Sequence, residues 1–171
     1  MRDLLDFLDT SGPYLLRLLY RVTLREDVAE DLLQELFLRL QASDGFRSTA
    51  NRWAYARGTA LHLAFDWRRD QRRCPIAALP PDEAVTSDPS PLQRLIEDEE
   101  IQTVLDLMAE LPMPSVELLT MRYLQQDSYE TIAHQLGKTA HQARALCHKA
   151  LIQLRDLARE KQRVDLEREQ P

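Results

Sequence analysis

The sequence is short of glycine, of cysteine and of long hydrophobic runs, and each shortage excludes a class of protein. Only four of its 171 residues are glycine. Leucine, alanine, glutamate and arginine are abundant and favour helices. Two cysteines, Cys74 and Cys147, make no disulfide framework. No hydrophobic run approaches the length of a membrane span, and the first residues lack a secretory pattern. We therefore predict an all-α protein of the cytoplasm.

The sequence also lacks the patterns that common catalytic sites require. It has no phosphate-binding glycine loop, and no nucleophile with an evident base. His141 and His148 would lie roughly 10 Å apart along a helix axis, at about 1.5 Å per residue, which is too far for a helical metal pair. Cys147 falls on the apolar side of the same segment. We expect no metal, no cofactor and no enzymatic activity.

Positive charge is concentrated in two segments, although the net charge is −6. Residues 47–73 hold seven arginines against two aspartates. Residues 138–161 hold six basic side chains against two acidic ones. Between these segments, residues 82–100 hold seven acidic side chains and one arginine. This alternation favours two separate contacts with nucleic acid over a uniformly acidic surface.

Proline divides the chain into two parts. Five of the nine prolines lie in residues 74–93, where a long helix cannot persist. We predict two small helical domains, at residues 1–73 and 94–163, joined by this proline-rich linker. The remaining residues, 164–171, are expected to form a frayed tail.

The N-terminal part carries three predicted helices. Pro13 suits the first turn of one helix, which continues through an apolar stripe. A second helix is expected at about 26–41, where apolar residues recur at helical spacing. Residues 43–52 are polar and predict a connecting loop. A long helix follows over about 50–73.

Near the C-terminus, the spacing of small and apolar residues predicts a helix-turn-helix. The residues at this spacing are Ile132, Ala133, Leu136, Gly137, Ala143 and Leu146. Ala133 would let the helices approach closely, and Leu136, Ala143 and Leu146 would lock them together. Gly137 would end the first helix, and Thr139 with Gln142 would form a capping box for the second. Asp127 or Ser128 would cap the first helix, with Glu130 available for its box. An ordinary pair of packed helices is the alternative.

Two polar helix faces are candidates for contact with nucleic acid. The last helix carries Gln and Arg, which can hydrogen-bond base edges, and Lys, which suits phosphates. The long helix carries a stripe of arginines with an aromatic side chain among them, and Arg57, Arg68 and Arg72 are expected to widen its basic surface. For both faces, a simple solvated surface remains the alternative. On the long helix, Asp66 would then pair locally with Arg69, or Asp70 with Arg73.

Three quoted segments resemble one known family in the same order along the chain. "VAEDLLQELFLRL" is similar to the core-binding helix of the extracytoplasmic-function (ECF) group of RNA polymerase sigma factors. "HLAFDWRRDQRR" is similar to the end of that group's −10 promoter helix. The stretch from "LMAELPMPS" through "SYETIAHQLGKTAHQARALCHKAL" is similar to its −35-binding domain. The resemblance covers nearly all of residues 4–158.

The resemblance implies a role for each surface. Contacts with the core polymerase, at the clamp helices of the β′ subunit, would come from Asp31, Gln34, Glu35 and Leu38. Contacts with the −10 element, whose bases are captured as a single strand, would come from Arg47, Asn51, Arg52, Tyr55, His62, Asp66 and Arg69. Contacts with the −35 element would come from Thr139, His141, Gln142, Arg144, His148 and Lys149. The β and β′ subunits and promoter DNA are the implied partners, and the acidic linker would pass near the RNA exit path.

Several residues depart from the family's pattern. The family usually has Asn at the position of His62, Gly-Thr-Val at 141–143, and an aliphatic residue at Lys138. The leading hypothesis is an ECF sigma factor that directs core polymerase to promoters and aids −10 melting. A sigma-like decoy that binds an anti-sigma factor without initiating transcription is the second hypothesis. A stand-alone helix-turn-helix repressor is the third, but it leaves "AEDLLQELFLRL" unexplained.

Overall fold

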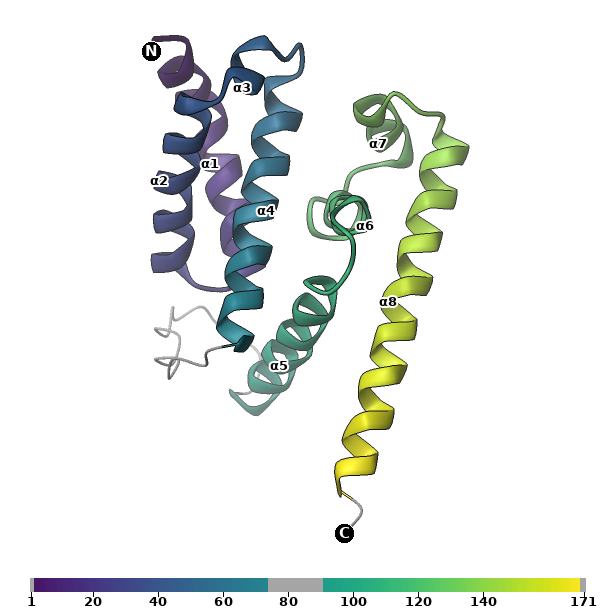
Figure 1. The fold of residues 1–171 in the computed structure, drawn as a ribbon. Coiled ribbons are helices and arrows are strands. Elements are labelled where there is room, and N and C mark those ends of the chain that lie inside the picture. The colour runs from purple at the N-terminus through teal and green to yellow at the C-terminus, as the bar shows by residue number, and fades with distance from the viewer. Residues whose placement is uncertain (1, 74–90, 170–171) are drawn as a thin grey trace. The chain divides into compact units, whose positions relative to one another are not determined.

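The structure is a computed structural model that describes residues 2–73 and 91–169 (Figure 1). Every regular element among these residues is a helix or a helical turn, and none is a strand. The prediction of an all-α protein is therefore confirmed. The chain forms two compact units, Met1–Pro81 and Asp82–Pro171, which are described separately below.

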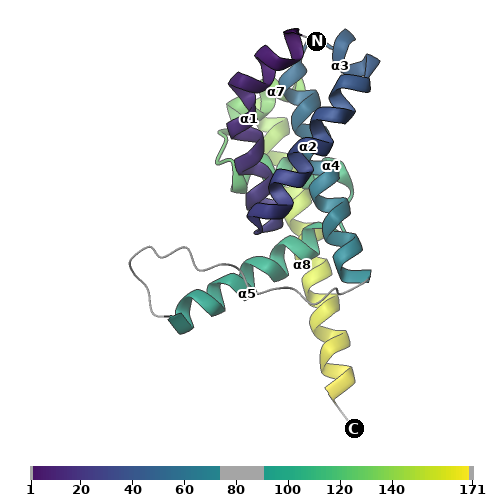
Figure 2. The ribbon, with the colours of Figure 1, turned by 90° about the vertical axis from the view of Figure 1, so that its left-hand side faces the viewer.

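Unit 1 is a bundle of three long helices with one short helix at its end. Helices α1 (Arg2–Thr23), α2 (Glu26–Ala42) and α4 (Arg52–Arg73) pack against one another, and both ribbon views show them side by side (Figures 1 and 2). The short helix α3 (Asp44–Ser48) joins α2 to α4. Leucine, valine and alanine side chains at helical spacing fill the core. Burial of this apolar stripe is the main reason that the three helices hold together.

Two expectations for unit 1 were wrong. Pro13 does not begin a helix but lies inside α1. Proline removes only one backbone donor from the helix. The helix continues because Leu15, Leu18 and Leu19, which follow Pro13 in α1, are buried in the core. The expected polar loop contains α3, because the Ser43 side chain caps this helix and Phe46 anchors it in the core.

Unit 2 consists of a helical hairpin and the helices that pack against it, around a small hydrophobic core. Helix α5 (Pro91–Met108) is followed by α6 (Met113–Leu119) and a π-helical turn η1 (Thr120–Leu124). Helices α7 (Tyr129–Leu136) and α8 (Ala140–Glu169) form the hairpin, with α6 packed against α8. The buried core of this hairpin comprises Leu118, Met121, Ile132, Ala133, Ala143 and Cys147, with Leu136 and Leu146 at its edge. The predicted locking residues therefore lie at the contact between α7 and α8.

The ends of two helices differ from the expected boundaries. Residues 91–93 of the predicted linker belong to α5, whose first residue, Pro91, suits that position; residues 74–90 lie outside the described part. The expected frayed tail is helical as far as Glu169. Residues 164–169 contain no glycine or proline to end the helix, and Arg163 donates to Glu160 at 2.6 Å on the last turns.

None of the described helices combines the length and the hydrophobicity that a membrane crossing requires.

Candidate functional site

Helix α2 presents a narrow face of polar and apolar side chains. Asp31, Gln34 and Leu38 are exposed, and Leu38 keeps 57% of its surface accessible. Leu36 and Leu40 are buried on the opposite side and fix the direction of this face. Glu35 differs from its neighbours because it accepts a hydrogen bond from Nε of Arg39 at 2.7 Å. Its charge is paired within the helix, whereas Asp31 extends into solvent.

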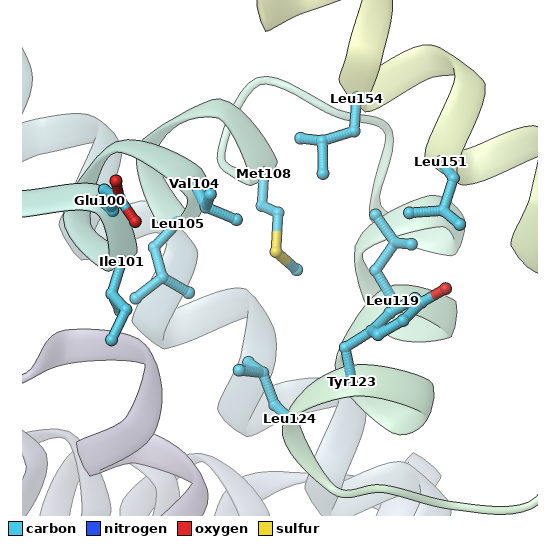
Figure 3. Close-up of a pocket in the computed structure, with 10 residues that line it drawn as sticks. All are labelled: Glu100, Ile101, Val104, Leu105, Met108, Leu119, Tyr123, Leu124, Leu151 and Leu154. Carbon is cyan, nitrogen blue, oxygen red and sulfur yellow. The ribbon is translucent and has the colours of Figure 1, made fainter. Parts of the chain in front are cut away.

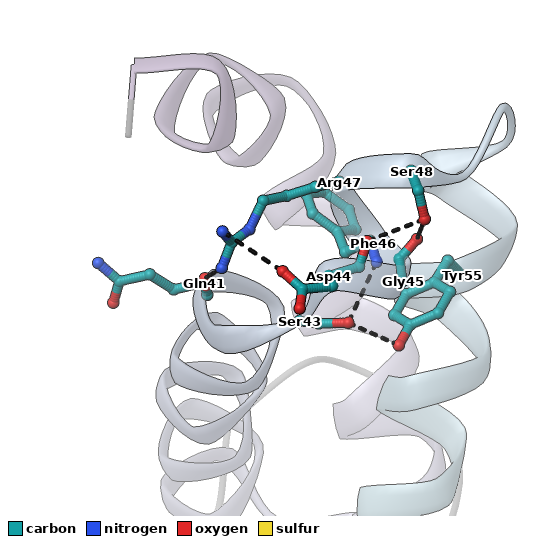
Figure 4. A network of polar contacts seen from close by, with 8 residues as sticks. All are labelled: Gln41, Ser43, Asp44, Gly45, Phe46, Arg47, Ser48 and Tyr55. Carbon is teal, nitrogen blue, oxygen red and sulfur yellow. Dashed lines mark hydrogen bonds and ion pairs between the residues drawn. The ribbon is translucent and has the colours of Figure 1, made fainter.

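The junction of α3 and α4 holds several of the predicted −10 residues (Figure 4). The hydroxyl of Tyr55 is hydrogen-bonded to Oγ of Ser43 at 2.8 Å, and the same Oγ accepts the backbone N–H of Phe46. Arg47 reaches back to α2, where its Nη2 donates to the Gln41 carbonyl at 3.0 Å. Its Nη1 lies 3.5 Å from Asp44. Arg47 and Tyr55 thus lie at one end of unit 1 and are both held by local contacts.

Asn51 and Arg52, at the start of α4, have structural contacts of their own. Oδ1 of Asn51 accepts the backbone N–H of Ala54 at 3.0 Å, which is the bond of a helix N-cap. The guanidinium of Arg52 lies 5.5 Å from the centre of the Phe46 ring, within cation–π range. Both side chains therefore help to build the junction that the resemblance assigns to DNA.

The later part of α4 carries three of the predicted −10 residues, His62, Asp66 and Arg69. His62 and Asp66 are exposed as expected. Asp66 accepts a hydrogen bond from Arg69, so the local pairing that was the alternative interpretation is present. These three residues lie on the same stretch of the helix, away from the α3 junction.

Arg57 and Arg68 do not widen the basic surface, and that expectation was wrong. Their exposed fractions are 2% and 4%. Nε of Arg68 donates to the carbonyl oxygen of Val22 at 2.6 Å, near the C-terminus of α1. That carbonyl lies in the last turn of a helix, where it has no partner within the helix. The arginine satisfies this carbonyl, and its own side chain is buried within unit 1.

The turn between α7 and α8 follows the predicted chemistry closely. Gly137 ends α7 with φ of 61°, a left-handed conformation that glycine adopts at least cost. Thr139 and Gln142 form the full capping box: Oγ1 of Thr139 accepts the Gln142 N–H at 3.2 Å, and Oε1 of Gln142 accepts the Thr139 N–H at 3.0 Å. Ser128 caps α7 by accepting the N–H of Thr131. Thr131, not Glu130, therefore occupies the third position of α7, and the expected box with Glu130 is absent.

The first turns of α8 separate cleanly into a buried and an exposed side. Ala143, Cys147 and Ala150 are buried. The exposed side includes all the predicted −35 side chains, namely Thr139, His141, Gln142, Arg144, His148 and Lys149. Burial raises the pKa of the Cys147 thiol. Cys147 is therefore a packing residue, as predicted.

A cluster around Tyr129 was missed in the sequence. The guanidinium carbons of Arg122 and Arg144 lie 4.6 Å and 5.1 Å from the centre of the Tyr129 ring. Arg122 also donates to the Asp127 carbonyl at 2.9 Å. The neighbouring Glu130 carboxylate has a lowered pKa, because it accepts hydrogen bonds from the Glu130 backbone N–H and from Ser128. The positive charges of Arg144 and Arg122 lower this pKa further. Arg144 is thus held beside α7, because an aromatic face attracts a cation.

Unit 2 also has an apolar groove of about 430 Å³. Figure 3 shows leucine, isoleucine, valine, methionine and tyrosine side chains from α5, α6, η1 and α8 around it, with Glu100 as the charged member. Ile101, Val104 and Tyr123 are exposed at its rim. This surface is chemically distinct from the basic face of α8. Among the described residues, no group of three metal-ligating side chains comes together.

Comparisons with known proteins agree with the arrangement of unit 1. The family model of sigma-70 region 2 matches residues 7–74. A probable RNA polymerase sigma factor, RfaY of Xanthomonas campestris pv. campestris, is 30% identical over 146 residues. The match covers 77% of this chain but only 36% of RfaY, so the chain spans about a third of that relative's length.

A solved structure also matches most of the chain. The sigma factor RpoE, in its co-crystal with the anti-sigma factor NepR from Bartonella quintana, is 20% identical. The match covers 93% of this chain and 98% of that one, with a TM-score of 0.48.

The α2 face and the α3–α4 junction both lie within the part of the chain that the region 2 model matches. The family model and the sequence relative agree with the resemblance found in the quoted motifs. Residues 7–74 of the chain are therefore similar to region 2 of the sigma-70 RNA polymerase sigma factors.

Proposed function

We propose that this chain binds core RNA polymerase through α2 of unit 1 and directs it to promoter DNA. The observation that carries this proposal is the exposed α2 face, within a unit that matches sigma-70 region 2. Asp31 supplies an exposed negative charge for basic groups of the polymerase, and Leu38 supplies an apolar contact beside it. A central apolar residue flanked by polar ones is the usual composition of a protein interface.

Unit 1 would also capture the −10 element. The α3–α4 junction presents Tyr55, an aromatic ring on which an unstacked base can lie, next to the cations of Arg47 and Arg52. Base–aromatic stacking with positive charge nearby is the usual means of binding single-stranded DNA. Melting would draw on this binding energy and requires no covalent chemistry, so the protein acts without being an enzyme.

Unit 2 would contact the −35 element through the start of α8. Arg144 is the strongest candidate for a base edge, because the Tyr129 ring holds its guanidinium in place. His141, His148 and Lys149 would lie against the DNA backbone. Gln142 is more restricted, because its Oε1 already accepts the Thr139 N–H. It could donate from its amide nitrogen but could not form a bidentate pair with adenine without breaking the cap.

A core-binding assay tests the first step. Asp31→Lys combined with Leu38→Asp should abolish co-purification with core polymerase, because it reverses the charge and removes the apolar contact of the α2 face. Asp9→Lys is the matched control, since Asp9 is exposed on α1 of the same unit. Equal core binding by all three proteins would sink the α2 assignment.

Run-off transcription and footprinting test the second step. With core polymerase, the wild-type protein should initiate transcription on promoter fragments recovered by the holoenzyme from genomic DNA. Protection should extend over both promoter elements. If the protein failed to bind core polymerase, the proposed function itself would fall.

A sigma-like decoy is the second candidate, favoured by one specific observation. Gln142, a side chain suited to reading bases in α8, has its Oε1 engaged in the capping box within unit 2. A decoy would bind an anti-sigma factor tightly and leave no promoter footprint. Footprinting with core polymerase present separates the two candidates, and a stand-alone repressor would protect DNA without core polymerase at all.

A further inference from the structure

The side chain of Tyr55 is held in place by a hydrogen bond to Ser43, which lies twelve residues earlier in the sequence. Its hydroxyl is bonded to Ser43 Oγ at 2.8 Å, and that oxygen is itself fixed by the Phe46 N–H at 3.1 Å. Figure 4 shows the tyrosine ring beside α3, with its hydroxyl turned toward Ser43. A tyrosine on the outside of a helix ordinarily samples several rotamers. This bond selects one of them.

Gly45 contributes the second constraint. A methyl group in place of its hydrogen would lie 3.0 Å from the Tyr55 hydroxyl oxygen and 3.1 Å from a ring carbon. That spacing is tighter than a normal van der Waals contact, so the ring would have to shift. The absence of a side chain at Gly45 therefore lets Tyr55 lie directly against the backbone of α3.

Phe46 supplies a rigid support beneath this pair. Its ring is buried and makes an edge contact with Phe7, at 5.3 Å between centres. The Tyr55 ring lies 6.1 Å from Phe46 on the other side, and Arg52 lies 5.5 Å from the same ring. Even so, Tyr55 remains 38% exposed. One part of the ring is fixed and another part is open to a ligand.

We propose that Ser43 and Gly45 are positioning residues that hold the Tyr55 ring ready for an unstacked base of single-stranded promoter DNA. This inference rests on the proposed function, and it assigns to these two residues a role that the sequence motifs did not suggest. A ring that is already fixed loses no rotamer freedom when a base stacks on it. Removing the constraint should weaken single-strand binding by about 2- to 10-fold, the range expected when one side chain must be ordered on binding.

The probe is a single-stranded oligonucleotide that the wild-type holoenzyme selects from a random pool, with binding followed by fluorescence anisotropy. Tyr55→Leu removes the ring and should show the largest loss. Tyr55→Phe keeps the ring and removes only the bond to Ser43. Gly45→Ala keeps both Ser43 and the Tyr55 hydroxyl, but its added methyl group displaces the Tyr55 ring. Both should fall within the 2- to 10-fold range.

Ser48→Ala is the matched control. Its hydroxyl donates to the carbonyl oxygens of Asp44 at 2.9 Å and Gly45 at 3.4 Å within the same short helix, and it is not a partner in the bond between Ser43 and Tyr55. It should leave oligonucleotide binding unchanged. Core binding and duplex binding at the −35 element should be unchanged in every variant, which separates positioning from a general loss of folding.

A double-mutant cycle decides the matter, because Ser43 also caps α3. If Ser43 acts through Tyr55, Ser43→Ala should weaken single-strand binding little further once Tyr55→Phe is present. Fully additive losses would overturn the proposal, as would unchanged binding by Tyr55→Leu. Those outcomes leave the sigma function intact, whereas failure of the wild-type protein to bind core polymerase would remove the proposed function itself.

Discussion

Helices α4 and α8 are both rich in basic residues, yet they use them in different ways. In α4, Arg57 and Arg68 are buried within unit 1. In the first turns of α8, the buried side is made of Ala143, Cys147 and Ala150, and the cations of that segment are exposed. Some of the positive charge of α4 is thus packed inside a bundle, whereas that of the first turns of α8 forms a surface.

The difference lies in what packs against each helix. Helix α4 lies against both α1 and α2, so a wide sector of its circumference is covered. Long polar side chains on the covered side of α4 must form hydrogen bonds inside the unit, as Arg68 does with the carbonyl oxygen of Val22. The start of α8 meets α7 through small residues, which leaves most of its circumference in solvent. The number of charged residues in a helical sequence therefore indicates the charge of the protein surface only where other helices cover a small part of that helix.

The largest effect should come from Arg68. Arg68→Ala should lower the free energy of unfolding of unit 1 by about 3 kcal/mol, because it leaves the buried Val22 carbonyl without a partner and removes packed aliphatic atoms. Arg73→Ala, on the exposed end of the same helix, should stay within about 0.5 kcal/mol of wild type. Urea denaturation of the two variants measures this directly. Similar midpoints would mean that the buried arginine does not support the bundle.

Arg144 should show the opposite behaviour. Arg144→Ala should weaken promoter duplex binding by roughly tenfold, the cost of one lost base contact, with little change in stability. Arg159→Ala is the control, because Arg159 is exposed farther along α8. Footprint titration with the holoenzyme provides the measurement. Equal protection by both variants would place −35 recognition elsewhere.

A smaller effect should separate Gln142 from its neighbour in the sequence. Gln142→Ala should destabilise unit 2 by about 0.5–1 kcal/mol, because it removes half of the capping box at the start of α8. His141→Ala, which removes an exposed side chain one residue earlier, should change the midpoint of thermal unfolding very little. Should both variants melt at the wild-type temperature, the capping box would contribute no net stability.

The smallest effect concerns Cys147, which should be chemically silent in the folded protein. Its thiol pKa is raised by burial from an ordinary value of 9.0, so it stays protonated at a pH where an unfolded thiol begins to ionise. In a Cys74→Ser background, a thiol reagent at pH 8 should react slowly with the native protein and rapidly in urea. Fast labelling without urea would show that this side of α8 is open to solvent.

Local features of the site could be predicted from the sequence with good accuracy. Gly137 and the pair Thr139–Gln142 act over a few residues, so their spacing is sufficient to predict the turn and the cap. The apolar face of α2 was predictable for the same reason, since helical periodicity places Leu36 and Leu40 on one side. The continuation of α1 through Pro13 was not, because tertiary packing outweighed the local preference.

Contacts between distant residues could not be predicted in this way. The bond between Ser43 and Tyr55 links the start of α3 to α4. The Tyr129 ring of α7 contacts Arg122 of η1 and Arg144 of α8. Neither contact leaves a periodic signal. Both depend on the direction in which one helix crosses another.

The sequence by itself determined the helical class, the cap and turn before α8, and the order of the motifs that resemble those of the sigma factors. Each of these depends on residue type and on spacing within a few turns. Only the tertiary structure decided that Arg57 and Arg68 are buried, that Gln142 is engaged in a cap, and that Tyr55 is fixed against α3. The physical reason is that a side chain's exposure depends on its neighbours in space, and those neighbours come from other helices.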